Sequence, residues 1–94
     1  MEKLNNPAIL VVDMLNDFVT GALTCDRAKA IVPATAELLD AARKAGVPVI
    51  FCNDAHIAGI DRELKIWGDH AIAGTKGAEV IPELKLSDKD YVVP

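Results

Sequence analysis

Four side chains of metal-binding type fall within one short stretch of the chain. They are Asp54, His56, Glu63 and His70. Asp54 and His56 project to the same side of an extended chain, and Glu63 and His70, about two helical turns apart, would share a face if their segment is helical. Imidazole nitrogen and carboxylate oxygen suit zinc, iron or manganese better than calcium. The same residues also fit two solvated histidines in an acidic loop, so the spacing alone leaves both interpretations open.

Asp13 is a second candidate because it directly follows an apolar run, Ala8–Val12. Ligands of open parallel sheets bind beyond the carboxyl ends of the strands. Residues 53–56 follow the next apolar run in the same way. If the two strands are neighbours, Asp13 and residues 53–56 lie at the same edge of the sheet. The alternative is that Asp13 is a turn carboxylate that accepts hydrogen bonds from the next backbone amides.

The two cysteines are weaker candidates for a nucleophile. Cys52 falls inside the second apolar run, where a free cysteine acts as a small apolar residue. Cys25 has no histidine near it in the sequence. The single tryptophan, Trp67, is either a core residue beneath the loop or a wall of the site.

The elements that would position these residues follow the order strand, helix, strand. The β-branched and leucine-rich run Ala8–Val12 predicts a strand buried on both faces, as in parallel sheets flanked by helices. The segment between the two apolar runs predicts a helix. Pro33 fits only the first turn of this helix, and Gly46 suits the left-handed cap at its end. Val47–Cys52 predicts the second strand of a right-handed βαβ unit. The apolar positions that recur at helical spacing are Ile31, Ala34, Leu38, Ala41, Ala42 and Ala45.

Residues 53–77 are polar and contain both histidines and four of the six glycines. Connections of this length are usually functional or disordered, and the apolar side chains among these residues favour order. Residues 79–84 then predict a short turn of structure, and residues 87–89 predict a turn into a third strand, Asp90–Val93. The predicted fold class is α/β, with a parallel sheet flanked by helices.

Length and composition exclude several classes of protein. Ninety-four residues allow at most one small domain, and 51% apolar residues are too many for a disordered chain. No apolar run approaches the ~18 to 20 residues that span a bilayer. The net charge of −4 and the scattered basic residues argue against nucleic acid as a partner. Without a CxxC motif or a signal-peptide pattern, we expect free thiols in a reducing cytoplasm.

These residues together resemble the N-terminal half of the isochorismatase-like cysteine hydrolases, and within them the metal-containing nicotinamidases. The resemblance covers the whole chain and rests on two motifs. Positions 9–18, Ile-Leu-Val-Val-Asp-Met-Leu-Asn-Asp-Phe, resemble the opening strand and catalytic aspartate of the family. The more specific motif is Asp54-Ala55-His56 followed by His70-Ala71-Ile72-x-Gly74-Thr75-x-Gly77.

The resemblance implies a six-stranded parallel sheet in a Rossmann-like, three-layer arrangement, of which this chain would hold the first three strands and the first main helix. It implies that Asp13 belongs to an Asp–Lys–Cys triad and accepts the proton of the thiol that attacks an amide carbonyl. Phe18 and Trp67 would be walls for a planar ring. The implied activity is hydrolysis of a small amide, above all nicotinamide to nicotinate and ammonia.

The resemblance also implies a cofactor. Asp54, His56 and His70 would hold a divalent metal that orients the substrate ring, and Glu63 falls where one branch of the nicotinamidases places a further carboxylate ligand. The metal expected is zinc, with iron and manganese as alternatives.

The triad lysine and cysteine of the family have no counterpart in residues 1–94, and neither do the oxyanion-hole amides near that cysteine. The family lysine follows the third strand, so we expect it just beyond Pro94. We therefore expect residues 1–94 to be the N-terminal part of a single domain and to be inactive alone. Their partners would be a small amide substrate and either the C-terminal half or further copies in a homo-oligomer.

Two alternatives remain from the sequence. One is a non-catalytic half-domain that binds a metal or pairs with a partner chain along the open edge of its last strand. The other is a hydrolase of the same family with another substrate, such as a ureido compound or isochorismate.

Overall fold

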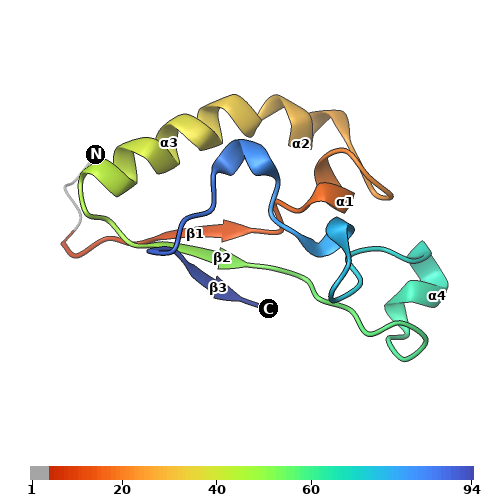
Figure 1. The fold of residues 1–94 in the computed structure, drawn as a ribbon. Helices are drawn as coiled ribbons and strands as arrows, with labels where there is room; N and C mark the ends of the chain where they lie inside the picture. The colour runs from red at the N-terminus through yellow and green to blue at the C-terminus, as the bar shows by residue number, and fades with distance from the viewer. Residues whose placement is uncertain (1–4) are drawn as a thin grey trace.

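The computed structural model describes residues 5–94 and contains one parallel sheet with its main helix on one face (Figure 1). The strands are β1 (Ile9–Val12), β2 (Val49–Cys52) and β3 (Tyr91–Val93), in the order β1-β2-β3. Both pairings are parallel. The three predicted strands and the predicted α/β class are therefore confirmed, with each strand starting one or two residues later than expected.

Helix α3 (Val32–Lys44) forms the crossover between β1 and β2. Its ends agree with the sequence signals, because Pro33 lies in the first turn and Gly46 follows the last turn with a φ of 75°. The remaining elements are α1 (Asn16–Val19), α2 (Asp26–Ala30), α4 (Glu63–Trp67) and the 3₁₀ turns η1 (Lys76–Ala78) and η2 (Pro82–Leu84). Within residues 5–94, no helix is both long and apolar enough to cross a membrane.

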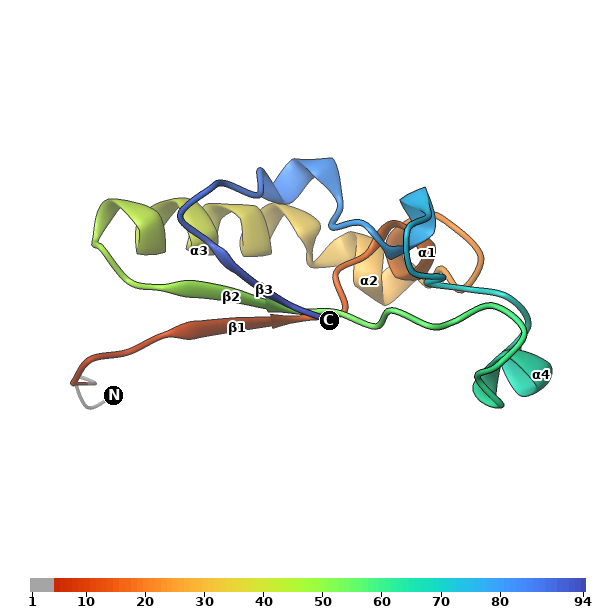
Figure 2. The ribbon, with the colours of Figure 1, turned by 60° about the horizontal axis from the view of Figure 1, so that its bottom comes forward.

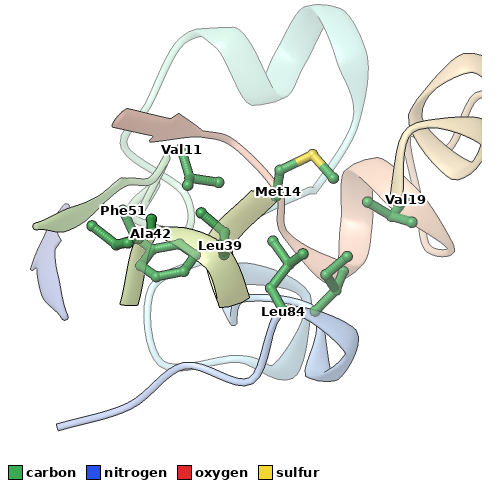
Figure 3. Close-up of a cluster of buried hydrophobic side chains, with 9 residues drawn as sticks. Val11, Met14, Val19, Leu39, Ala42, Phe51 and Leu84 are labelled. Carbon is green, nitrogen blue, oxygen red and sulfur yellow. The ribbon is translucent and has the colours of Figure 1, made fainter. Parts of the chain in front are cut away.

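The core lies between the sheet and α3, and the η2 segment packs on the same side (Figure 2). Figure 3 draws nine of its side chains and labels seven, which come from β1, β2, α3, η2 and the segment 14–19: Val11, Met14, Val19, Leu39, Ala42, Phe51 and Leu84. Because strand side chains alternate between faces, the row Val11, Phe51 and Val92 is on the side of this core. The sheet is thus covered on that side over β1 and β2, whereas Val92 of β3 is 50% exposed.

The opposite face of the sheet is uncovered in the described part of the chain. Leu10 and Val12 of β1 are each 62% exposed, and so is Tyr91 of β3. The prediction of a β1 strand buried on both faces is therefore wrong for residues 5–94. The physical reason is that the one long helix covers a single face, so alternate strand residues remain in solvent.

The buried face of α3 also differs from the predicted one. Leu39 and Ala42 are buried, whereas Leu38 is 54% exposed and Ile31 is 50% exposed. Leu38 and Ile31 border a groove along β1 instead of pointing into the core. The helix therefore carries an apolar surface wider than the part that contacts the sheet.

Arg43, in the last turn of α3, connects three elements. Its guanidinium donates to the Leu84 carbonyl at 3.1 Å and to the Asp90 carboxylate at 2.7 Å. The same carboxylate accepts the Ser87 N–H at 3.0 Å. These contacts fix the turn that leads into β3 against the end of the helix.

Candidate metal centre

The four predicted ligand residues converge at the carboxyl end of the sheet. One ligand atom from each of Asp54, His56, Glu63 and His70 lies within 4.8 Å of those of the other three. Asp54 and His56 follow β2, and Glu63 opens α4, which lies beyond the end to which the strand arrows point (Figure 1). The four side chains that the sequence singled out are therefore neighbours in the fold and could hold a metal ion.

The route that brings His70 to this cluster is not the predicted one. Helix α4 ends at Trp67, and Gly68 then takes a φ of 79°, so Glu63 and His70 do not share a helical face. Instead, His56 forms a parallel bridge with Ile72, in which the His56 N–H donates to the Ala71 carbonyl at 2.8 Å. This bridge holds the segment that directly follows His70 beside His56.

Both imidazole rings are fixed through Nδ1 and leave Nε2 free. His56 Nδ1 is 3.1 Å from Asp61 Oδ2, and His70 Nδ1 is 2.8 Å from the Gly68 carbonyl oxygen. Each Nε2 is buried and has no hydrogen-bond partner among residues 5–94. His70 is only 2% exposed. Because a buried polar atom without a partner is costly, a ligand at these two nitrogens would stabilise the fold.

Carboxylate oxygens complete the cluster. His56 Nε2 is 3.5 Å from Asp54 Oδ2 and 3.6 Å from Glu63 Oε2, and His70 Nε2 is 3.7 Å from Glu63 Oε1. Two imidazole nitrogens and two carboxylates match the ligand set of zinc and of other divalent transition metals. The residues therefore fit a divalent cation, and the arrangement favours a metal site over a solvated loop.

Asp13 adjoins this cluster and has an unusual backbone conformation. It directly follows β1 with a φ of 58°, in the left-handed region that non-glycine residues rarely adopt. Its N–H donates to the Cys52 carbonyl at 3.0 Å, and its Oδ1 accepts the Asp54 N–H at 3.0 Å. Its carboxylate thus bonds across to the neighbouring strand end, not within its own turn.

The surroundings of Asp13 raise its pKa. Burial is the largest cause, and the nearby carboxylates of Asp54 and Glu63 act in the same direction. The hydrogen bond from the Asp54 N–H opposes them. Asp13 is therefore a stronger base than an ordinary exposed aspartate.

The two aromatic residues predicted as ring walls lie in different surroundings. The Phe18 ring meets the His70 ring edge-on, with centroids 5.8 Å apart. Trp67, the last residue of α4, is 62% exposed, and Leu64 is the buried residue of that helix. Trp67 is therefore not a core residue, and its role as a wall stays a prediction.

The structure adds Asp17, which the sequence reasoning did not single out. Its carboxylate accepts the N–H of Ala71, the residue after His70, at 2.8 Å, and that of Ala22 at 3.3 Å. A Cβ added at Gly77 would overlap this carboxylate. No periodic pattern marks such a contact, because the partners are 54 residues apart.

The cysteines do not enter the cluster. Both are free, with Cys25 exposed and Cys52 half-buried in β2. Cys52 lies in the register row of Val12 and Val93, on the uncovered side of the sheet. The apolar interpretation of Cys52 is consistent with this position.

Comparison with known proteins assigns the family. Residues 7–94 match the model of the isochorismatase domain, so the chain belongs to the isochorismatase family. A probable inactive nicotinamidase of Arabidopsis thaliana is 33% identical over 100 residues, covering 95% of this chain and 50% of the relative. The chain thus spans about half the length of the curated relative it matches.

Solved structures agree with this assignment. N-carbamoylsarcosine amidase from Thermoplasma acidophilum is 40% identical and matches with a TM-score of 0.85 over 94% of this chain and 50% of that one. A pyrazinamidase of Pyrococcus horikoshii in complex with zinc is 27% identical and matches with a TM-score of 0.81 over the same shares of the two chains. The three parallel strands with their crossover helix are therefore an isochorismatase-like fold.

Proposed function

We propose that residues 1–94 form the N-terminal part of a single amidohydrolase domain that hydrolyses nicotinamide to nicotinate and ammonia. The observation that carries this proposal is the pair of buried, unpartnered Nε2 atoms beside two carboxylates, joined by the Asp54 N–H to Asp13. The similarity to a pyrazinamidase solved in complex with zinc supports a divalent metal as the ligand of these side chains.

Asp54, His56, Glu63 and His70 would hold the divalent ion. When bound there, such an ion supplies a localised positive charge that attracts and orients a ring nitrogen of the substrate. Phe18, edge-on to His70, would border the ring on one side. Trp67 is the proposed second wall.

Asp13 would act as the base of the reaction. Its Oδ1 accepts the Asp54 N–H, so its second oxygen remains to take the proton of a cysteine thiol supplied from outside residues 1–94. Burial, the largest cause of the raised pKa of Asp13, favours this proton transfer relative to an exposed aspartate. The resulting thiolate would attack the amide carbonyl, the proton held by Asp13 would pass to the departing ammonia as the C–N bond breaks, and water would then hydrolyse the thioester to the carboxylate. A lysine from outside these residues would complete the triad.

A second substrate class is an N-carbamoyl amino acid, which is a ureido compound. The observation that favours it is the 40% identity to an N-carbamoylsarcosine amidase. A non-catalytic metal-binding module is the third candidate, since the Arabidopsis relative is described as a probable inactive nicotinamidase. One set of assays separates the three.

The test measures ammonia release by the protein at its natural length, supplied with nicotinamide, pyrazinamide or N-carbamoylsarcosine, together with its metal content by elemental analysis. We expect ammonia from nicotinamide and near-stoichiometric metal that falls sharply in His56→Ala, which removes one of the two free Nε2 atoms. The matched control is Asp69→Asn, an exposed change in the same loop.

The outcomes discriminate between the candidates. Ammonia from N-carbamoylsarcosine alone would establish the second substrate class. Bound metal without turnover of any of the three amides would favour the non-catalytic module. Protein that takes up no zinc would overturn the metal site itself.

A further inference from the structure

We propose that Asp61 is a positioning residue of the metal centre, which holds His56 with its Nε2 lone pair directed at the ion. This inference rests on the proposed metal site. Asp61 is not itself within the ligand cluster, which consists of Asp54, His56, Glu63 and His70. It acts through the other nitrogen of the His56 ring.

The geometry of Asp61 ties the ring to the backbone. A single oxygen, Oδ2, lies 3.1 Å from His56 Nδ1 and accepts the Ile57 N–H at 2.8 Å. The carboxylate is thereby fixed relative to the chain on which His56 sits, although its side chain is 37% exposed. A ring bonded to this oxygen cannot rotate freely about its χ angles.

The chemistry of the contact determines which nitrogen is free. An ionised carboxylate only accepts hydrogen bonds, so it favours the proton on Nδ1. The lone pair of a neutral imidazole is then on Nε2, which faces Asp54 at 3.5 Å and Glu63 at 3.6 Å. A carboxylate on the distal nitrogen also increases the basicity of the ligating nitrogen.

His70 provides an internal comparison. Its Nδ1 is held by the Gly68 carbonyl at 2.8 Å, a backbone group that no side-chain substitution removes. His56 depends instead on one side chain. Asp61 is therefore the position at which the orientation of a ligand can be altered without removing a ligand.

The experiment measures zinc affinity by competition with a chelator, using the protein at its natural length. We expect Asp61→Ala to bind zinc about 10- to 100-fold more weakly than the wild type. Asp61→Asn keeps an oxygen that can accept both hydrogen bonds, so we expect a smaller loss. Asp69→Asn makes the same change in charge in the same loop and should leave the affinity unchanged.

A second readout separates positioning from a general effect on the loop. In zinc-loaded protein labelled with ¹⁵N-histidine, the His56 Nδ1 proton should give a downfield, exchange-protected resonance. It should move upfield in Asp61→Asn and be lost to exchange in Asp61→Ala, while the His70 Nδ1 resonance stays in place. Circular dichroism of each variant checks that the fold is retained, and Asp61→Asn serves if the alanine variant does not fold.

The inference is overturned if the wild type binds zinc and Asp61→Ala binds it equally tightly. An unchanged His56 Nδ1 resonance in Asp61→Ala overturns it as well. A wild type that binds no zinc overturns the metal site and this inference together, so the two failures are distinguishable.

Discussion

The side chains around Asp13 illustrate what residue types predict and what they do not. The proposed ligands Asp54, His56, Glu63 and His70 could be named as candidates from the sequence because imidazole and carboxylate are the usual ligands of such metals. Asp17 and Asp61 could not be identified in this way. Each is one acid among 14, and its importance comes from hydrogen bonds that only the folded loop creates.

Asp13→Asn tests the role of the base without disturbing the site. Asparagine tolerates the left-handed φ of 58°, and its side-chain oxygen can still accept the Asp54 N–H. The fold and the metal content should therefore persist. Loss of the proton acceptor should lower the rate of amide hydrolysis by about 10²- to 10⁴-fold. The measurement is kcat/KM for ammonia release by the natural-length protein, alongside its zinc content.

Asp26→Asn, an exposed change in α2, is the matched control and should keep full turnover. If Asp13→Asn keeps wild-type turnover as well, Asp13 is not the base. If it loses metal in parallel with activity, its role lies in holding Asp54.

Among the elements, those with strong local signals were predictable and those fixed by contacts were not. Helix α3 has a proline in its first turn, basic residues in its last and a glycine after its end, so its limits could be read from the sequence. Helix α4 has only five residues, too few to be stable by local interactions. Its place depends on tertiary contacts such as the burial of Leu64, and no periodic pattern signals them.

The contact between α3 and the turn before β3 gives a prediction that depends on pH. Burial alone would raise the pKa of Asp90, but hydrogen bonds from Arg43 and from the Ser87 N–H outweigh it, and the pKa lies below the ordinary value of 3.8. A carboxyl whose pKa is lowered by folding stabilises the fold above its unfolded pKa. That stabilisation disappears as the pH falls through the lower pKa of the folded state.

Asp90→Asn should therefore lower the free energy of unfolding by about 1.5–3 kcal/mol at neutral pH, the usual value for a hydrogen bond to a charged group. The difference from the wild type should shrink as the solution becomes more acidic than pH 3.8. Urea unfolding across the acidic range measures both effects.

Asp40→Asn is the matched control, because Asp40 is 3.9 Å from Arg43 and its side chain is 51% exposed. Such an exposed pair contributes about 0.2–1 kcal/mol at most. A difference between wild type and Asp90→Asn that stays constant at every pH would contradict the ionic origin of the effect.

For the whole molecule, the decisive feature is the bare face of the sheet. Leu10, Val12, Tyr91 and Val93 are all more than half exposed. The sequence predicted that β1 is buried on both faces because its residues are apolar throughout, and hydropathy alone does not reveal whether a second layer is present. The Arabidopsis relative and the N-carbamoylsarcosine amidase are each about twice as long as this chain, so they contain further residues of the same family.

A polypeptide limited to residues 1–94 should bind a hydrophobic dye such as ANS and self-associate as its concentration rises, since exposed apolar patches promote association. Dye fluorescence and analytical ultracentrifugation measure these effects. Replacing Leu10 and Tyr91 together by serine should reduce both, because the two residues are register neighbours of Ile50 on the bare face.

Leu39→Ser is the contrasting control, since it opens the core and should increase dye binding. A monomeric polypeptide that binds no dye would show that the bare face does not drive association.

The closeness of the four ligand residues in the sequence, all between positions 54 and 70, has a consequence for how the metal and folding are coupled. An unfolded chain keeps these side chains close together along the sequence, so we expect zinc to bind the denatured state too, more weakly than the native one. The rise in melting temperature produced by zinc should then be smaller than its native-state affinity implies. The contacts of Asp13 and Asp17 span 41 and 54 residues and exist only after folding. The four proposed ligands are therefore near one another in the sequence before folding, whereas the site shaped by Asp13 and Asp17 forms only with the native fold.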